Sequence, residues 1–204
     1  MNNLNYTEKT KKHFDDIAST YANSSDGKFC KAAYDSIIAE LEKFKSGKWL
    51  DVSCGPGTVL SMLSDSPLDK YGIDFSEKMI DEARNNVANS AHLYVASAEE
   101  LPFENNAMDV VTCSFAFHHY IHPATVLHEF RRVMKKGASL AIVDPYLPHP
   151  LRFIINPLLR FSNNGDFHMY GRKELNKLMR EHGFELENFK RIDKKYFFCQ
   201  CKAV

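Results

Sequence analysis

The segment WLDVSCGPGTVL, residues 49–60, decides the fold of this chain. Its apolar start belongs to a short strand that we expect over Lys48–Ser53. The small residues from Ser53 to Gly57 follow as a loop, and a helix is expected from Thr58. A loop of small residues between a strand and a helix lets a ligand approach the backbone closely. The segment therefore predicts a strand, a ligand-binding loop and a helix in direct succession.

Strands and helical patterns alternate along the rest of the chain. Further strands are expected at Lys70–Asp74, His92–Ala96, Val110–Phe117 and Ser139–Val143. Alternation of this kind predicts a parallel α/β sheet whose strands are joined by right-handed crossovers. The last two strands, Phe184–Ile192 and Lys195–Lys202, lie too close in sequence for a crossover helix. We therefore expect an antiparallel hairpin at one end of the sheet.

Composition excludes several classes of protein. The chain has 204 residues, 44% hydrophobic and 25% charged, which excludes wholesale disorder, and we expect a single domain over residues 1–204. Lys and Arg total 26, as do Asp and Glu, so the chain lacks the basic excess of a phosphate-backbone binder. It has neither a long apolar run for a transmembrane helix nor a signal-peptide core. Five cysteines without a CxxC pair indicate reduced thiols and a cytoplasmic protein.

An acidic residue ends the second expected strand. Asp74 follows Gly57 by seventeen residues, and a carboxylate there can accept two hydrogen bonds from a ribose diol. Together with the glycine loop, this spacing indicates an adenosine-type cofactor. A nicotinamide-binding loop has the pattern GxGxxG, but here Leu60 stands at the third glycine position. That residue counts against a nicotinamide oxidoreductase.

Four segments, taken in order, resemble the class I methyltransferases that use S-adenosylmethionine, and most closely the branch of ubiquinone and menaquinone C-methyltransferases. They are WLDVSCGPGTVL at 49–60, YGIDFSEKMI at 71–80, VASAEELPF with DVVTCSFAFHH at 95–119, and LHEFRRVMKKGASLAIV at 127–143. The resemblance implies a Rossmann-like, mostly parallel sheet of seven strands in the order 3-2-1-4-5-7-6, with helices on both faces. It also implies methyl transfer from S-adenosylmethionine, yielding S-adenosylhomocysteine, to a small organic acceptor.

The resemblance also implies a set of cofactor-binding residues. Those expected around the methionine part are Tyr21, Asp51, Ser53, Cys54, Gly55, Gly57 and Phe115. Those expected around the ribose and adenine are Asp74, Phe75, Met79, Ser97, Ala98 and Glu99. Within these sets Asp51 would brace the glycine loop and Asp74 would hold the ribose hydroxyls. Tyr21 belongs to an N-terminal lid segment, residues 1–27, that would close over the methionine carboxylate.

Two positions depart from the family pattern. Ser53 stands where the family usually has its first glycine, and Ser97 stands where many members have an aspartate facing the adenine amine. A serine is small and its hydroxyl can still accept a hydrogen bond, so we expect cofactor binding to survive. The same departures motivate the alternative, a catalytically silent cofactor-binding or scaffold protein that kept the fold.

His118 and His119 are the candidate catalytic residues. They follow the fourth expected strand, a segment that in the family faces the methyl group, and either one would serve as a general base near neutral pH. No Cys, Asp or Glu nearby in sequence completes a metal-ligand set, so no metal is expected. Asp144-Pro145-Tyr146 follows the wrong strand for the signature of nucleic-acid amino-methyltransferases, which disfavours a nucleic-acid substrate.

Residues 145–170 interrupt the alternation with an apolar insert, where the family commonly builds its substrate cover. Its apolar residues are Leu151, Phe153, Ile154, Ile155, Leu158, Leu159 and Phe161. The insert would line a pocket for a hydrophobic acceptor, form a homodimer contact, touch a membrane surface or pack as a small satellite core. Arg152, Arg160 and His168 are polar candidates there for an anionic group.

Overall fold

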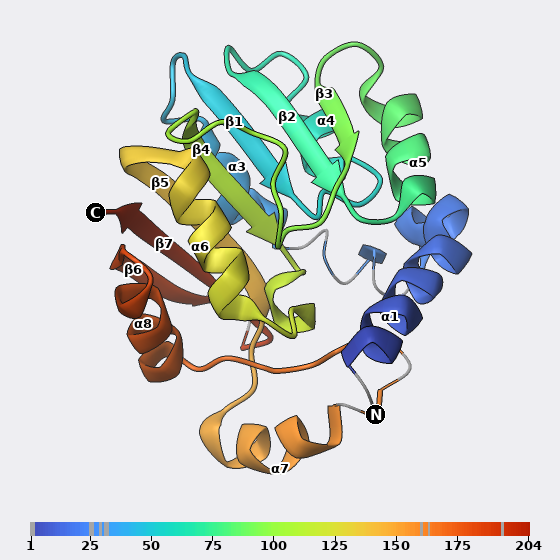
Figure 1. Ribbon diagram of the computed structural model, residues 1–204, viewed down its shortest axis with the longest axis vertical. Coiled ribbons are helices and arrows are strands. Elements are labelled where there is room, and N and C mark those ends of the chain that lie inside the picture. The colour runs from blue at the N-terminus through green and yellow to red at the C-terminus, as the bar shows by residue number, and fades with distance from the viewer. Residues whose placement is uncertain are drawn as a thin grey trace.

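The computed structural model describes residues 3–24, 27–28, 30, 33–159, 161–162, 164–192 and 194–204. These residues contain one seven-stranded sheet in the order β3-β2-β1-β4-β5-β7-β6 (Figure 1). The strands are β1 Lys48–Val52, β2 Asp69–Asp74, β3 His92–Val95, β4 Met108–Ser114, β5 Met134–Pro145, β6 Phe184–Ile192 and β7 Tyr196–Ala203. The expected order of strands is confirmed.

Strand β1 lies in the interior of the sheet and pairs in parallel with β2 on one side and β4 on the other. The pairs β2–β3 and β4–β5 are also parallel, whereas β5–β7 and β6–β7 are antiparallel, which confirms the terminal hairpin. Because β1, β2 and β4 run in the same direction, their carboxyl ends meet at one edge of the sheet. In open α/β sheets ligands bind at that edge.

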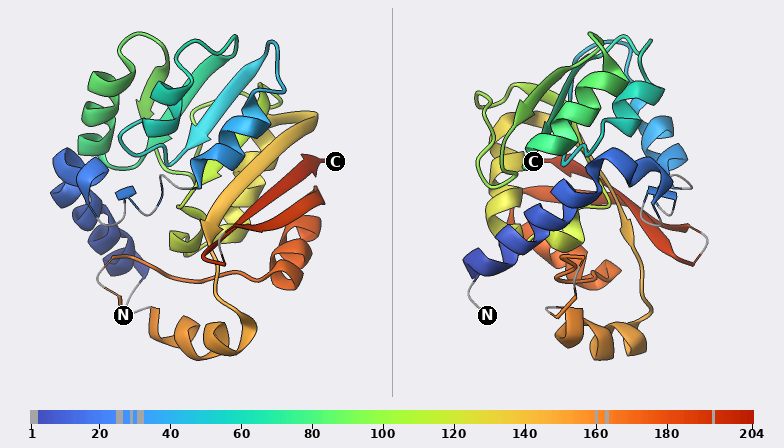
Figure 2. Two further views of the ribbon diagram at one scale, coloured as in Figure 1. Left: turned by 180° about the vertical axis from the view of Figure 1, so that it is seen from behind. Right: turned by 90° about the vertical axis from the view of Figure 1, so that its right-hand side faces the viewer.

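Helices cover both faces of the sheet, as expected. Helices α6 Pro123–Val133 and α8 Arg172–Glu181 pack against one face, with Phe130 and Met179 fully buried there. Helices α3 Tyr34–Leu41, α4 Thr58–Met62 and α5 Glu77–Val87 cover the other face (Figure 2, left). Burial on both sides explains why β1 is apolar along most of its length.

Two helices begin at residues that favour a helix start. Ser76 caps α5, with its Oγ accepting the Met79 N–H at 3.1 Å, and Pro123 stands in the first turn of α6. Ala33, Ile37 and Leu41 repeat at helical spacing and are buried at α3, which ends at Leu41.

The fourth expected strand, Val110–Phe117, is too long at its carboxyl end. Strand β4 ends at Ser114, and Phe115 adopts a left-handed backbone with φ of +53°. The Phe115 N–H donates to the Val143 carbonyl at 2.7 Å, which holds this bend against β5. The chain then enters the short 3₁₀ turn η2, Phe117–His119. The bend carries both candidate histidines away from the sheet.

Three helical segments lie at or beyond the carboxyl edge of the parallel strands. Helix α1 Asn3–Ile17 and the 3₁₀ helix η1 Ala18–Asn23 run past that edge, and Asp15 accepts a hydrogen bond from the Ser76 hydroxyl of the α5 cap. Helix α7 His149–Leu159, within the insert, stands apart from the sheet in both views of Figure 2. Among the described residues, no helix combines the length and apolar character needed to span a bilayer.

Candidate functional site

A cavity lies at the carboxyl ends of β1, β2 and β4, beneath α1. Ten of the thirteen expected cofactor residues line it: Tyr21, Ser53, Gly55, Asp74, Phe75, Met79, Ser97, Ala98, Glu99 and Phe115. We call this space the first cavity. Asp51, Cys54 and Gly57 are not among its lining residues.

The backbone of the glycine loop explains why Gly55 lines the first cavity whereas Cys54 and Gly57 do not. Gly55 has φ of +53°, and open space lies where its Cβ would stand, so its backbone is exposed to the cavity. Gly57 has φ of +72°, and a Cβ there would come within 2.9 Å of Val87 Cγ1 on α5. Gly57 therefore allows α4 and α5 to pack closely, whereas Gly55 leaves room for a ligand. Cys54 is buried beneath the loop, and its N–H donates to the Ile73 carbonyl at 2.9 Å.

Asp51 lies below the loop in a buried hydrogen-bonded chain. Trp49 Nε1 donates to Thr112 Oγ1 at 2.7 Å, and the Thr112 hydroxyl donates to Asp51 Oδ1 at 2.7 Å. Burial raises the pKa of Asp51 to about 7; the Thr112 hydrogen bond opposes this rise, and the charge of Asp74 adds to it. The chain ties β1 to β4 directly under the cavity.

Asp74 reaches the cavity from the end of β2. Its Oδ2 accepts the Gly55 N–H and its Oδ1 accepts the Ser76 N–H, both at 2.9 Å. Burial raises the pKa of Asp74 to about 6, although these backbone donors lower it. The carboxylate therefore carries its charge at neutral pH and is held rigidly between the glycine loop and α5.

Two serines supply hydroxyl groups to the same cavity. Ser53 has φ of +55°, a backbone that favours glycine, and its hydroxyl is hydrogen-bonded to Tyr120 Oη at 2.9 Å. Ser114 Oγ is buried and has no hydrogen-bond partner within the described part of the chain. Because buried polar groups are normally paired, this hydroxyl is suited to a ligand group in the cavity.

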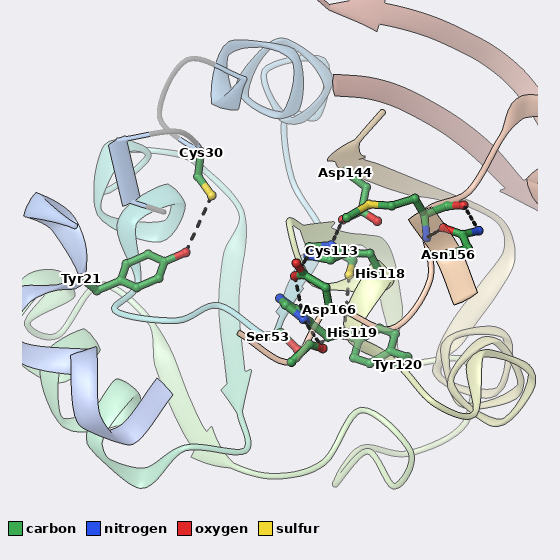
Figure 3. Close-up of polar contacts among 12 residues, drawn as sticks. Tyr21, Cys30, Ser53, Cys113, His118, His119, Tyr120, Asp144, Asn156 and Asp166 are labelled. Carbon is green, nitrogen blue, oxygen red and sulfur yellow. Dashed lines mark hydrogen bonds and ion pairs between the residues drawn. The ribbon is translucent and has the colours of Figure 1, made fainter. Parts of the chain in front are cut away.

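His118 lies between two carboxylates (Figure 3). Its Nδ1 is 2.8 Å from Asp144 Oδ1 on β5, and its Nε2 is 3.2 Å from Asp166 Oδ1 in the segment after α7. Burial would lower the pKa of His118, but Asp144 and Asp166 together raise it to about 10. His118 is therefore an imidazolium at neutral pH, and an imidazolium cannot accept a proton from a substrate. It does not line the first cavity.

His119 has the opposite electrostatic character. Its Nδ1 lies 2.7 Å from the Gly165 carbonyl, so Nδ1 carries the proton and donates it there. Burial and then the positive charge of His118 lower the pKa of His119 to about 3. His119 is a neutral imidazole on the cavity wall, with its lone pair on Nε2.

A second cavity adjoins the first. Both are lined by Phe14, Tyr21, Phe115 and His119. The second cavity adds Cys30, His118, Pro145, Asn164, Asp166 and Met169. The shared residues form a partition, with Tyr21 and His119 on the boundary. The site is thus a pair of adjoining spaces, one with the glycine loop and Asp74 and one with aromatic, apolar and polar walls that include both histidines.

Comparisons with known proteins agree on one family. Residues 50–142 match a family model described as a methyltransferase domain. A demethylmenaquinone methyltransferase of Staphylococcus aureus is 30% identical over 173 residues, covering 72% of this chain and 72% of that protein. One from Thermotoga maritima is 29% identical over 87% of this chain and 90% of its own length.

The fold agrees with these relatives. A methyltransferase from Aquifex aeolicus that depends on S-adenosylmethionine shares it with a TM-score of 0.68, at 22% identity, over 84% of this chain and 90% of that one. This chain belongs to the class I S-adenosylmethionine-dependent methyltransferases. The methyltransferase therefore carries its glycine loop and Asp74 at the edge of the sheet where ligands bind in such folds.

Two carboxylates of the methyltransferase site were not expected from the sequence. Asp166 and Asp144 both pair with His118, and Asp166 completes a His118–His119–Asp166 group whose ligand atoms lie within 4.8 Å of one another. His118 already contacts a carboxylate with each ring nitrogen, and His119 Nδ1 donates to Gly165. These contacts already occupy both ring nitrogens of His118 and Nδ1 of His119, so the three residues form a cluster of ion pairs and hydrogen bonds. Asp144 lies at the end of a strand, a position that favours a site residue, whereas no sequence signal marks Asp166.

The insert of the methyltransferase contributes to the site through its flanks. Pro145, Asn164, Asp166 and Met169 line the second cavity, whereas no residue of α7 lines either cavity. Two of the expected anion-binding candidates pair with Glu174 instead: His168 Nε2 at 2.6 Å and Arg152 Nε at 3.9 Å. The third, Arg160, lies outside the described residues.

Proposed function

We propose that the methyltransferase binds S-adenosylmethionine in the first cavity and methylates a small hydrophobic organic acceptor held in the second. The observation that carries this proposal is the convergence of the rigid, ionised Asp74 carboxylate and the buried Ser114 hydroxyl on a cavity at the carboxyl ends of the strands. A carboxylate suits a ribose diol, and the hydroxyl offers a hydrogen bond that no described residue takes up.

The walls of the first cavity support the division of roles implied by the resemblance. Phe75 and Met79 provide an apolar surface for the adenine ring. Ser97 Oγ accepts the Glu99 N–H at 3.1 Å, which leaves its own O–H to donate to the adenine edge. The open backbone of Gly55 accommodates the methionine part, and Asp51 braces the loop from below.

When bound, S-adenosylmethionine supplies an electrophilic methyl group for an in-line displacement. The protein then contributes mainly proximity and alignment, which can lower a barrier by about 7–11 kcal/mol. The position of His119 on the shared wall suits its Nε2 to accept a hydrogen bond from an acceptor hydroxyl. We assign His118 a positioning role, because its charge and its two carboxylate partners fix η2 against β5 and the segment after α7.

The second cavity supports a hydrophobic, ring-containing acceptor. Phe14, Tyr21, Phe115 and Met169 give it an aromatic and apolar lining. The names of the Staphylococcus aureus and Thermotoga maritima relatives specify a demethylated menaquinone as their acceptor. We propose an acceptor of that chemical class and a reaction in the cytoplasm, and the neutral charge balance of the chain argues against a nucleic-acid acceptor.

Thermal melts with S-adenosylhomocysteine and with NADH test the cofactor. A ligand present at 100 times its dissociation constant stabilises a protein by about 2.7 kcal/mol, or roughly 5–11 °C for a chain of this size. We expect that shift with S-adenosylhomocysteine alone. Asp74→Asn should weaken S-adenosylhomocysteine binding at least about tenfold. The matched Asp81→Asn, an exposed carboxylate on α5, should bind as the parent does.

The outcomes separate the alternatives. A shift with NADH and none with S-adenosylhomocysteine would indicate a nicotinamide site. No shift with either ligand, in protein shown to be free of copurified nucleoside, would support the scaffold alternative. With binding established, transfer of labelled methyl to hydroquinones with and without an isoprenoid tail then tests the acceptor class.

A further inference from the structure

Helix α7 presents its apolar residues outward and its polar residues inward. Phe153, Ile154, Leu158 and Leu151 have exposed fractions of 78%, 63%, 58% and 50%. Among its apolar residues, only Leu159 is buried. Surface helices of water-soluble proteins normally show the reverse arrangement. We call Leu151, Phe153, Ile154 and Leu158 the apolar face of α7.

Polar contacts on the inner side hold this orientation. Asn156 Nδ2 donates to the Met169 carbonyl, and the Met169 N–H donates to Asn156 Oδ1, both at 3.1 Å. Arg152 Nη1 donates to the Leu147 carbonyl at 3.1 Å, and its Nε lies 3.9 Å from Glu174. Because these polar contacts set the rotation of α7 about its axis, the outward direction of the apolar face is a built feature of the insert.

The segment that carries the apolar face contains no acidic residue. The sequence has no Asp or Glu between Asp144 and Asp166, although the chain contains 26 such residues. Lys9 Nζ donates to the Ser162 carbonyl at 2.9 Å, which places a cation just beyond the end of α7, and His149 is exposed at its start. An apolar helix face in a segment free of acidic residues, with the Lys9 cation beside its end, complements an anionic lipid surface.

We propose that the apolar face of α7 docks the methyltransferase on an anionic lipid bilayer. A helix lying in the interface buries one apolar face to a depth of about 5–10 Å, and α7 offers such a face. A stable protein partner needs roughly 800 Å² on each side, more than four partly exposed side chains of one eleven-residue helix provide. A second copy of the chain is therefore the less suitable occupant.

Docking through α7 would also orient the site. The chain leaves α7 and within a few residues reaches Asn164, Asp166 and Met169, which line the second cavity. A bilayer under α7 would therefore lie near the space assigned to the hydrophobic acceptor. This consequence rests on the proposed function, whereas the docking itself does not.

Co-flotation with lipid vesicles tests the docking. Vesicles of phosphatidylcholine mixed equally with phosphatidylglycerol should carry the protein upward, and vesicles of phosphatidylcholine alone should carry much less. The double variant Ile154→Glu/Leu158→Glu should lower the bound fraction roughly tenfold or more, because two carboxylates then face the lipid. Met62→Glu is the matched control, since Met62 is 46% exposed on α4 at a distance from α7 and should bind as the parent does.

Binding of S-adenosylhomocysteine by the double variant shows that the fold and the first cavity are intact, so failure of docking and failure of the proposed function can be told apart. If that variant does not fold, Phe153→Ser serves in its place, with a smaller but measurable loss of vesicle binding. Equal flotation of parent and variant would overturn the proposal. So would absence of the parent from both kinds of vesicle, and self-association abolished by the variant would then identify a second copy as the occupant.

Discussion

Replacing His118 with glutamine should lower the free energy of unfolding by about 3–5 kcal/mol at pH 7. The substitution removes the cation between Asp144 and Asp166 and leaves Asp144, which is fully buried, without its charge partner. Breaking a buried ion pair from one side typically costs this much, because the remaining charge stays desolvated. For a chain of this length the loss corresponds to a fall in melting temperature of roughly 6–20 °C.

The pH dependence gives the same prediction a second, independent readout. The folded pKa of His118, about 10, lies above its ordinary value of 6.5, so its contribution to stability is complete below pH 6.5 and is lost as the pH rises through 10. From these two values the parent should lose about 3–4 kcal/mol between pH 7 and pH 10 through this group. His118→Gln should be nearly free of that slope.

Urea unfolding at pH 7 and pH 10 of the parent, His118→Gln, Asp144→Asn and the double variant measures these quantities. The double variant should be more stable than the sum of the single losses predicts, because neither charge is then left alone. His92→Gln is the control: His92 is 61% exposed and 3.5 Å from Asp69, so its loss should stay within about 0.5 kcal/mol. A loss below about 1 kcal/mol for His118→Gln with an unchanged pH slope would refute the reasoning. Abolished turnover at unchanged stability would instead restore His118 as a general base.

Three smaller predictions concern the first cavity and the loop and helices beside it. The ionised form of Asp74 is the one suited to ribose, and its pKa is about 6. The affinity for S-adenosylhomocysteine, measured by calorimetry, should therefore fall about tenfold from pH 7 to pH 5. An affinity that does not change with pH would contradict this. Gly57→Ala should cost about 1–3 kcal/mol in urea unfolding, because φ is +72° and Val87 lies where the methyl group would go; a neutral result would mean that the loop relaxes. Ser76→Ala should lower the free energy of unfolding by about 1 kcal/mol, because α5 loses its cap. The lost contact with Asp15 should also raise the rate of amide hydrogen exchange in α1. An unchanged exchange rate would show that α1 is held by other contacts.

The order of the sheet was predicted from the family resemblance. The alternation of strands and helical patterns predicted parallel pairing without fixing which strands are neighbours, and the short connection between β6 and β7 requires a hairpin. The error at Val110–Phe117 arose because Phe115 and Phe117 continue the apolar run. Hydrophobicity does not report the left-handed turn at Phe115, which is set by its hydrogen bond to Val143 on another strand.

Residues of the first cavity were predictable for a related reason. Ser53, Asp74 and Ser97 were assigned to the cofactor site through the family resemblance, and they lie at or just after the ends of parallel strands, whose carboxyl ends meet at one edge of the sheet. The partners of His118 follow no such rule. Asp144 comes from β5, and Asp166 comes from the far side of the apolar insert, whose path no sequence pattern predicted.

The two adjacent histidines show how tertiary contacts decide chemistry that residue identity leaves open. His118 and His119 have the same ordinary pKa, yet two carboxylates raise the pKa of His118, whereas burial and the neighbouring cation outweigh Asp166 and lower the pKa of His119. The charge on His118 itself helps to keep His119 neutral, so the wall between the cavities presents an unprotonated imidazole at any pH above about 3. Near neutral pH, we therefore expect an acidic limb in the activity of this methyltransferase to come from the buried carboxylates Asp51 and Asp74 rather than from either histidine.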